Sequence, residues 1–410
     1  MSSEKNSCTP KLRFPGFTGE WEEEKLKDVF VRIREKNNED NKNVLTISAQ
    51  YGLISQLDFF NKSVSAADVT GYYLLHKGDF AYNKSSSQGR PFGAIKPLKL
   101  YDKGVVSTLY ICFRCKDPKS VDFWEQYFDA GIIDNEIKSI AQEGARNHGL
   151  LNVPSNDFFE LIVKVPTHAE QEKIAACLSE LDALITAQGQ KVDTLKELKK
   201  GLMQQLFPKP GEATPRLRFP EFSGEWAYIN GDKLFESISN KNHNSDLPIL
   251  ALTQDQGAVP REMINYNVIV SDKSVASYKV VEVDDFIISL RSFQGGIEYS
   301  RYKGLCSPAY IVLRKKSKEL CSDFYRIYFK SFNYIQDLNR NLEGIRDGKM
   351  ISYKQFSEIK LPVTSLAEQQ KIAECISSLD CVIASETAKL ESLREHKTGL
   401  MQQLFPQSSK

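Results

Sequence analysis

Two long stretches of the chain, 169–208 and 367–406, place apolar residues at steps that alternate between four and three positions. This heptad spacing predicts a helix with one narrow apolar stripe, as in a coiled coil. The stripe, called the seam below, consists in the first stretch of Ile174, Leu178, Leu181, Ile185, Val192, Leu195, Leu202 and Leu206. In the second stretch it consists of Ile372, Ile376, Leu379, Ile383, Leu390, Leu393, Leu400 and Leu404. The pattern therefore predicts two long helices that each need a helical partner.

The two stretches are copies of one another. The segment AEQEKIAACLSELDALITAQGQKVDTLKELKKGLMQQLFP, which starts at Ala169, returns 198 residues later with 23 of 40 positions identical. The polar interruptions of the seam recur as well, as Gln188 with Glu386 and Lys199 with Lys397. Polar seam residues weaken a coiled coil but fix its register and its partner.

Both copies carry signals for where a helix begins and ends. Thr167–Glu170 and Ser365–Glu368 have the S/T-x-x-E spacing of a capping box, in which the two side chains satisfy free backbone N–H groups. Pro208 and Pro406 follow the last seam residues, and proline cannot continue the helical hydrogen bonds. Each helix should therefore run for about 38 residues, or about 57 Å at 1.5 Å per residue.

A narrow seam on a long helix must be covered, and the nearest matching surface is the second copy on the same chain. The sequence therefore predicts an antiparallel intramolecular coiled coil with a globular domain at each end. The alternative is that each helix is unrelated to the other and packs on its own domain.

The duplication extends into the globular halves, which differ widely between a few shared landmarks. The matched landmarks are Leu12–Phe17 with Leu217–Phe222, Asp79–Phe80 with Asp285–Phe286, Gln88–Gly89 with Gln294–Gly295, and Ser107, Tyr110 and Arg114 with Ser307, Tyr310 and Arg314. Strands are predicted from β-branched and aromatic content at 44–49, 79–82, 104–114, 161–165, 249–253, 285–290, 309–313 and 359–363. Helices are predicted at 123–140 and 322–342. Each half is thus an α+β domain on a shared scaffold.

Three loops at matched positions of the two halves carry hydrogen-bonding side chains that differ between the halves. Arg and Lys suit guanine, Gln and Asn suit adenine, and Ser suits either base or a phosphate. The candidate DNA contacts are Lys84, Ser85, Ser86, Gln88, Arg90, Arg146, Asn147, His148, Gln254, Arg291, Ser292, Gln294, Arg346 and Lys349. For any one of these residues an ordinary polar turn is the alternative, so the prediction depends on the recurrence of all three loops.

Composition narrows the class of protein without naming one. A net charge of +1 gives no bulk attraction to nucleic acid, although local patches matter more than totals. No apolar run approaches the length of a membrane span, and the start of the chain is not a signal peptide, so a cytoplasmic protein is expected. The eight cysteines fit reduced thiols, because the lone pair Cys112 and Cys115 has no second pair with which to bind zinc.

The sequence shows no catalytic motif. It has no phosphate-binding G-x-x-x-x-G-K-[ST] loop, no G-x-G-x-x-G after a strand, no H-E-x-x-H and no Asn/Asp-Pro-Pro-Tyr/Phe of amino-methyltransferases. The carboxylates Asp79 and Asp285, and Glu143 and Glu343, recur in the two halves and could serve a nuclease. They are more readily explained as side chains that hold loop backbone, so a chain without catalysis and without a metal is expected.

The alternation of two variable domains with two helices that open A-E-Q-x-K-I and close G-L-M-Q-Q-L-F-P resembles the specificity (S) subunit of Type I restriction–modification systems. The resemblance extends from about Leu12 to Pro406. It implies target recognition domains at 1–166 and 209–364, a spacer helix at 167–208, and a second spacer helix with the C-terminal tail at 365–410. Each domain would read one half of a bipartite site in double-stranded DNA.

The resemblance also implies partners and cofactors. Two methyltransferase (M) subunits would dock around the coiled coil, and restriction/translocase (R) subunits would complete the complex. S-adenosylmethionine would then belong to M and ATP with Mg²⁺ to R, leaving no cofactor in this chain. Two alternatives from other classes are a scaffold protein that binds no DNA and a metal-dependent nuclease that uses the recurring carboxylates.

Overall fold

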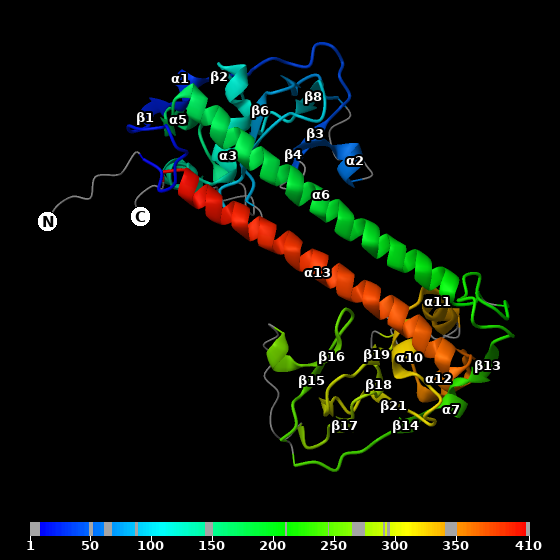
Figure 1. Ribbon diagram of the computed structural model, residues 1–410. Helices are drawn as coiled ribbons and strands as arrows, with labels where there is room; N and C mark the ends of the chain where they lie inside the picture. The colour runs from blue at the N-terminus through cyan, green and yellow to red at the C-terminus, as the bar shows by residue number, and fades with distance from the viewer. Residues whose placement is uncertain are drawn as a thin grey trace. The chain divides into compact units, whose positions relative to one another are not determined.

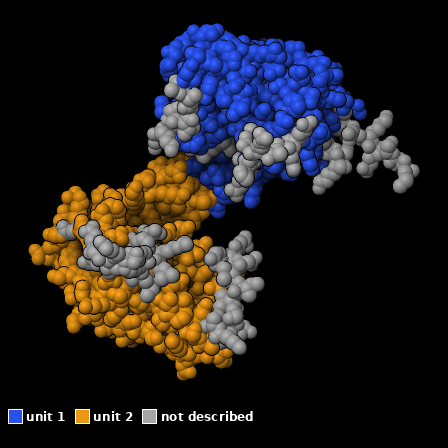
Figure 2. Space-filling view, turned by 180° about the vertical axis from the view of Figure 1, so that it is seen from behind, with its two compact units in different colours: residues 1–189, 388–410 blue, residues 190–387 orange. Residues whose placement is uncertain are grey.

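The structure is a computed structural model that describes residues 9–48, 52–60, 68–86, 89–143, 151–209, 211–244, 246–264, 275–289, 292, 296–340 and 351–406. The chain forms two compact units, of which unit 1 comprises residues 1–189 and 388–410 and unit 2 comprises residues 190–387 (Figure 2). Each unit therefore holds one globular half together with part of both long helices. This division differs from the boundaries expected from the sequence, because each helix contributes to two cores.

Unit 1 contains a mixture of short strands and short helices before the first long helix (Figure 1). Its strands are β1 (Glu22–Lys25), β2 (Phe30–Arg32), β3 (Leu45–Ser48), β4 (Gly52–Ser55), β5 (Tyr73–His76), β6 (Phe80–Asn83), β7 (Ala94–Pro97), β8 (Lys103–Val106), β9 (Ile111–Cys115), β10 (Gln142–Glu143), β11 (Leu151–Asn152) and β12 (Ile162–Val165). Its helices are α1 (Leu26–Val29), α2 (Gln56–Phe60), α3 (Val121–Asp129), α4 (Asp134–Ile140) and α5 (Ser155–Phe159).

The central sheet of unit 1 is antiparallel with the order β2-β9-β6-β7, and it is covered on both faces. Along β6, Phe80 and Tyr82 belong to a large aromatic core with Trp124 of α3, whereas Ala81 points into a smaller core with Leu45 of β3. This alternation follows from the two-residue repeat of side chains along a strand. Because both faces are covered, the middle of β6 contributes only buried side chains.

Unit 2 repeats this plan with its own elements. Its strands are β13 (Ala227–Asn230), β14 (Phe235–Ile238), β15 (Leu250–Thr253), β16 (Gly257–Pro260), β17 (Lys279–Val281), β18 (Phe286–Ile288), β19 (Glu298–Tyr299), β20 (Gly304–Cys306), β21 (Ile311–Lys315) and β22 (Lys360–Val363). Its helices are α7 (Gly231–Leu234), α10 (Ser322–Tyr328), α11 (Phe332–Arg340) and α12 (Tyr353–Glu358). The central sheet has the matching order β14-β21-β18-β19, with Phe286 in the aromatic core and Ile287 in the smaller one.

The two long helices, α6 (His168–Leu206) and α13 (Leu366–Leu404), have 39 residues each and pair antiparallel as expected (Figure 1). In unit 2, Lys191 pairs with Glu386 and Lys199 pairs with Asp380, so one residue number rises as the other falls. The twelve central seam residues are all buried or half-buried: Ile174, Leu178, Leu181, Ile185, Val192, Leu195, Ile372, Ile376, Leu379, Ile383, Leu390 and Leu393.

The GLMQQLFP ends of both helices are packing elements. Leu206 and Phe207 lie in the aromatic core of unit 2, and Leu404 and Phe405 lie in that of unit 1. An L-R-F-P segment is hydrogen-bonded to each of these ends in the same way. The Leu217 N–H donates to the Gln205 carbonyl at 3.0 Å, and the Leu12 N–H donates to the Gln403 carbonyl at 2.9 Å. The two helix ends have the same sequence because each is buried in the equivalent aromatic core of one unit.

Two segments expected to be single helices are pairs of helices. The 123–140 segment is broken between α3 and α4, where Gly131 has a φ of +69°, a conformation that ends a helix. The 322–342 segment is broken between α10 and α11 near Ser331. Likewise the 104–114 strand is two strands, β8 and β9, joined by a turn in which the Tyr110 N–H donates to the Ser107 carbonyl at 3.1 Å.

At the start of α13, only one of the two hydrogen bonds of the predicted capping box is formed. The Ser365 hydroxyl accepts from the Glu368 N–H at 3.3 Å, as the motif requires. The Glu368 carboxylate, however, receives two hydrogen bonds from Arg218 at 2.7 and 2.8 Å instead of turning back to the cap. Glu170 is held in the same way by Arg13, with both distances 2.7 Å. The arginine of each L-R-F-P segment thus ties its domain to the start of a long helix.

Candidate nucleic-acid interface

The loop after β6 in unit 1 displays the first group of sequence-predicted contacts. Ser85 and Ser86 are exposed, and the Ser85 N–H donates to the Asn83 Oδ1 at 3.1 Å, which turns the chain away from the strand. Lys84 is half-buried, and burial lowers the pKa of its ammonium. Its carbonyl accepts from the Leu151 N–H at 3.0 Å, so the base of the loop is fixed while Ser85 and Ser86 face solvent.

Arg90, at the far side of this loop, is anchored to helix α3. Its guanidinium donates to the Asp129 carbonyl at 3.1 Å and to the Asp129 Oδ1 at 3.2 Å. The side chain keeps 27% of its surface exposed, so the anchored guanidinium still presents an edge to solvent. Gly93 closes the loop with a φ of +85°, and a Cβ there would lie 2.2 Å from the Asn83 carbonyl oxygen. The loop is therefore held at both ends by its scaffold.

In unit 2 another of the three predicted loops, which the sequence matches to 50–52 of the first half, forms a hairpin tip. Gln254 is exposed at the turn between β15 and β16. The Thr253 hydroxyl shapes this turn, because it accepts from the Gln256 N–H at 3.0 Å and donates to the Gly257 carbonyl at 3.1 Å. Gly257 has a φ of +75° and approaches the Tyr299 carbonyl so closely that a Cβ would lie 2.4 Å from it. The exposed amide of Gln254 is thus presented on a rigid turn.

Ser292 does not fit its predicted role as a DNA contact. It is only 1% exposed, and its hydroxyl accepts from the Ser289 N–H at 2.9 Å. Its carbonyl accepts from the Gly296 N–H at 2.8 Å. A buried hydroxyl that shapes a turn cannot reach a base edge in this conformation, so we remove Ser292 from the expected contacts and assign it to the local fold.

Eight other predicted contacts lie outside the described residues and stay predictions of the sequence: Gln88, Arg146, Asn147, His148, Arg291, Gln294, Arg346 and Lys349.

The recurring aspartates are structural, as the simpler interpretation of the sequence held. Asp79 receives two hydrogen bonds from Arg114 at 2.6 and 2.8 Å, and it also accepts from the His76 N–H at 2.8 Å. Asp285 is bound by Arg314 in the same way, at 2.7 and 2.6 Å. Both carboxylates are buried, so they hold the turn before β6 or β18 instead of facing a substrate. Within the described ranges, no group of three or more His, Cys, Asp or Glu residues is placed to hold a metal ion.

A charge reversal separates the two units at one scaffold position. Lys96 of β7 pairs with Asp129 at 2.6 Å, and in register Lys96 lies opposite Ala81 of β6. Glu298 of β19 holds the equivalent position opposite Ile287, and it pairs with Lys330 at 2.6 Å. The fold therefore keeps an ion pair here, from a strand to the end of α3 in unit 1 and to the turn after α10 in unit 2, but exchanges its polarity.

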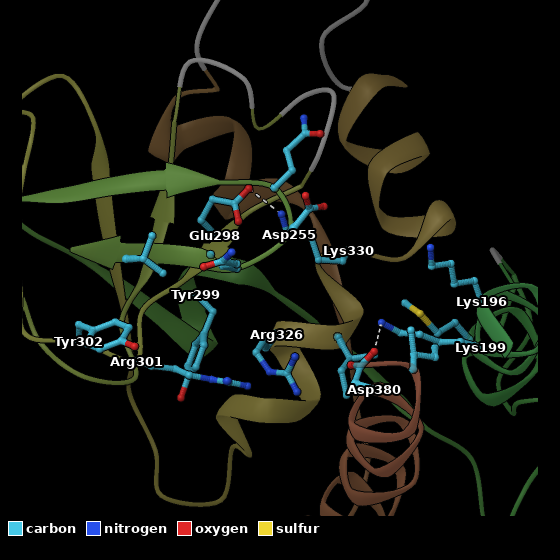
Figure 3. Close-up of a pocket in the computed structure, with 17 residues that line it drawn as sticks. Lys196, Lys199, Asp255, Glu298, Tyr299, Arg301, Tyr302, Arg326, Lys330 and Asp380 are labelled. Carbon is cyan, nitrogen blue, oxygen red and sulfur yellow. Dashed lines mark hydrogen bonds and ion pairs between the residues drawn. The ribbon is translucent and has the colours of Figure 1, made fainter. Parts of the chain in front are cut away.

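A groove in unit 2 was not predicted from the sequence. It has a volume of about 700 Å³ and lies between the paired long helices and the β15–β16 hairpin (Figure 3). Its lining includes Gln254 and five cationic residues, Lys196, Lys199, Arg301, Arg326 and Lys330. The only sequence signal was the spacing of Lys196, Lys199 and Lys200, which places three cations on one side of a helix.

Comparison with known proteins gives the context of this geometry. The family of the Type I restriction modification DNA specificity domain matches residues 18–197 and again residues 224–395. A candidate specificity subunit of the type I restriction enzyme MjaX from Methanocaldococcus jannaschii is 24% identical over 94% of this chain and 93% of its own length. The type I restriction enzyme MjaVIII specificity subunit of the same organism is 23% identical over 74% of each chain.

Solved structures agree on the fold. The S subunit of a Type I restriction–modification system from M. genitalium covers 98% of this chain with a TM-score of 0.56 and 16% identity, and 100% of that chain is matched. A chain from a study of assembly and conformational transition of the type I R-M system covers 97% of this chain and 99% of its own, with a TM-score of 0.55 and 17% identity. Because the family matches most of the sequence in two copies, this chain belongs to the Type I restriction modification DNA specificity domain family.

Proposed function

We propose that this chain is the DNA sequence-recognition subunit of a Type I restriction–modification complex, and that each globular domain reads one half of a bipartite site. The observation that carries the proposal is a shared scaffold with different exposed chemistry. The Asp79–Arg114 pair has its counterpart in Asp285–Arg314, yet the exposed loops differ. Equal scaffolds with unequal loops suit two different half-sites, because phosphate contacts position a domain while loop side chains read bases.

The experiment that tests this proposal is mapping of methylated adenines in a host that carries this chain with its methyltransferase partner. The expected result is one bipartite, asymmetric motif with a spacer of fixed length. Gln254→Ala should relax the motif in one half-site, and Lys84→Ala should affect the other half-site. Each lost base contact should cost about 1–3 kcal/mol of discrimination. If both variants altered the same half-site, or neither did, the assignment of one domain to each half-site would be wrong.

We also propose that the paired helices set the distance between the half-sites. Deleting residues 186–192 and 384–390 together removes one heptad from each helix and keeps the seam in phase. At 1.5 Å per residue this shortens the pair by about 10 Å, or about three base pairs at 3.4 Å each. The mapped spacer should shorten accordingly while both half-sites stay the same. An unchanged spacer in a folded variant would reject the helices as the ruler.

The partners follow from the same proposal. Two M subunits would dock around the coiled coil and supply the S-adenosylmethionine-dependent methylation, and R subunits would supply ATP-dependent translocation and cleavage. The chain itself would be non-catalytic and cytoplasmic, and none of the described helices is long and apolar enough to cross a membrane. Native mass spectrometry of co-expressed subunits should give two M per chain, and any other stable stoichiometry would contradict this assembly.

A further inference from the structure

The groove of unit 2 gathers positive charge on two different elements. Figure 3 shows Lys196 and Lys199 extending from α6 toward the open space that Arg301 and Arg326 face from the globular part of the same unit. Five cationic residues line the groove, against the three carboxylates Asp255, Glu298 and Asp380. A surplus of positive charge in a concave site concentrates anions there.

The cations differ in how much of their charge is already neutralised. Lys199 pairs with Asp380 at 2.6 Å, and Lys330 pairs with Glu298 at 2.6 Å. Lys196 and Arg301 are exposed, and within the part of the chain that the structure describes neither forms an ion pair. These two side chains are therefore the free positive charges of the groove.

The opposite wall of the groove carries a sequence-predicted base contact. Gln254 lines the groove from the β15–β16 turn, next to Asp255 and Gln256. Groups that read bases and groups that hold phosphates lie on the same DNA-binding surface, because phosphate contacts fix the register in which the bases are read. The groove places both kinds of group around one open volume.

The matching region of unit 1 lacks these free charges. The counterpart of Lys196 in the long helix is Arg394, which is paired with Glu391 at 2.8 Å. The counterpart of Arg301 is Lys99, because the preceding residues Ser300 and Leu98 bond the carbonyls of Asp285 and Asp79 in the same way. Lys99 is paired with Asp122 at 2.7 Å. The two free cations are thus a property of unit 2 alone.

We propose that this groove binds the sugar–phosphate backbone of DNA beside the half-site that unit 2 reads, with Lys196 of the spacer helix and Arg301 as direct phosphate contacts. The proposal builds on DNA recognition by this chain and adds that a long helix takes part in holding DNA, on one side of the molecule only. Lys196 and Arg301 are then positioning residues, which fix the register of Gln254 on the bases without reading sequence.

The test is the salt dependence of DNA binding by the complex of this chain with its methyltransferase partner. The slope of log K against log salt concentration is negative, and each phosphate contact adds about 0.9 to its magnitude. The double variant Lys196→Ala/Arg301→Ala should reduce that magnitude by about 1.8, which corresponds to roughly 30-fold weaker binding at 0.15 M salt. The methylated motif should stay the same, and Lys196→Arg should retain the wild-type slope. Arg394→Ala is the matched control in unit 1 and should leave the slope unchanged.

The outcomes separate this inference from the proposed function. A wild-type complex that does not prefer its mapped motif over scrambled DNA would reject the proposed function. A wild-type complex that does, together with an unchanged slope in the folded double variant, would reject the groove as a phosphate site. A changed motif would make these residues base contacts, and loss of the methyltransferase from the variant complex would make the groove a subunit interface. Either of these two results would also overturn the inference.

Discussion

Lys397 of α13 forms an ion pair with Asp182 of α6 at 2.6 Å, and the equivalent residues of the repeat, Lys199 and Asp380, form the same pair at the same distance. The sequence placed both lysines in the seam, where an unpaired charge is unfavourable. In unit 1 the Gln126 side-chain amide also donates to the Asp182 carboxylate at 2.8 Å. Each seam lysine therefore has one defined carboxylate partner, and a shift of the helices by one heptad would separate them.

The first prediction concerns the coupling between these two residues. A double-mutant cycle with Lys397→Ala and Asp182→Ala should give a coupling free energy of about 0.5–1 kcal/mol in urea unfolding, because Asp182 is 42% exposed and water screens the pair. The exchanged variant Lys397→Asp/Asp182→Lys should recover part of the loss. A coupling indistinguishable from zero would show that the pair fixes no register.

A stronger effect is expected at the arginine that ties each domain to a long helix. Glu170 has a side chain that is only 1% exposed, and Arg13 supplies both of its charged hydrogen bonds. Arg13→Ala leaves this carboxylate buried without its partner, so the free energy of unfolding should fall by about 3–5 kcal/mol.

Two variants control this experiment. Arg13→Lys keeps the charge but loses the two-pronged geometry, and its loss of stability should be intermediate. Arg218→Ala removes the same contact from Glu368 in unit 2 and should cost a similar amount. A loss below about 1 kcal/mol in both alanine variants would show that the ion pairs are dispensable.

The long helices could be predicted from the sequence because their signals are local and repeated. The heptad spacing around Leu178 and Ile376 and the prolines after Phe207 and Phe405 depend only on neighbouring residues. The Arg13–Glu170 pair could not be predicted, because it joins residues 157 positions apart through tertiary packing. The sequence pattern assigned Glu170 to a capping box, which is a local motif. In the structure its carboxylate instead binds the distant Arg13.

The candidate site shows the same limit in another form. Side-chain type alone grouped Ser292 with exposed Ser85, although one is buried and the other faces solvent. Burial depends on the packing of distant strands, which no pattern in the loop encodes. The groove could not be predicted because Lys196 and Arg301 are more than 100 residues apart in the sequence. They line one groove only once α6 has packed in unit 2.

Cysteine reactivity should follow burial. Cys115 is buried in the aromatic core of unit 1, and burial raises the pKa of its thiol to about 11. Cys381 is exposed on α13. At pH 8 the thiolate of Cys115 is present in only about one molecule in 1,000, and the thiolate is the reactive form. Iodoacetamide at pH 8 should therefore label Cys381 within minutes and Cys115 at a far lower rate, as mass spectrometry of peptides would show.

The sign of the pH dependence follows from the raised pKa. Labelling of native Cys115 should keep rising between pH 8 and pH 11, since the thiolate fraction grows throughout that interval. In denaturant Cys115 should react as fast as Cys381. Equal rates for the two thiols in the native protein would contradict the burial of Cys115.

Glycines near the ends of the long helices provide the last prediction. Gly201 and Gly399 occupy helical positions where an added Cβ would meet no other atom within 4 Å. Neither glycine is needed for a close approach within the chain, and glycine costs a helix about 1 kcal/mol relative to alanine. Gly201→Ala and Gly399→Ala should therefore each stabilise the isolated chain by up to about 1 kcal/mol in chemical unfolding. Gly189→Ala, at an equally open position in α6, should give the same gain, whereas Gly296→Ala should destabilise, because its Cβ would lie 2.0 Å from the Phe329 carbonyl oxygen.

The same variants distinguish a free helix surface from one reserved for a partner. If Gly201 and Gly399 face solvent in the assembled complex, the alanine variants should bind the methyltransferase subunits as tightly as the wild type. If another chain packs closely against these positions, the variants should be more stable alone but weaker in assembly, while Gly189→Ala retains full binding. Destabilisation of the isolated chain by Gly201→Ala would contradict both expectations, because it would require a contact within the chain that the open space around this glycine excludes.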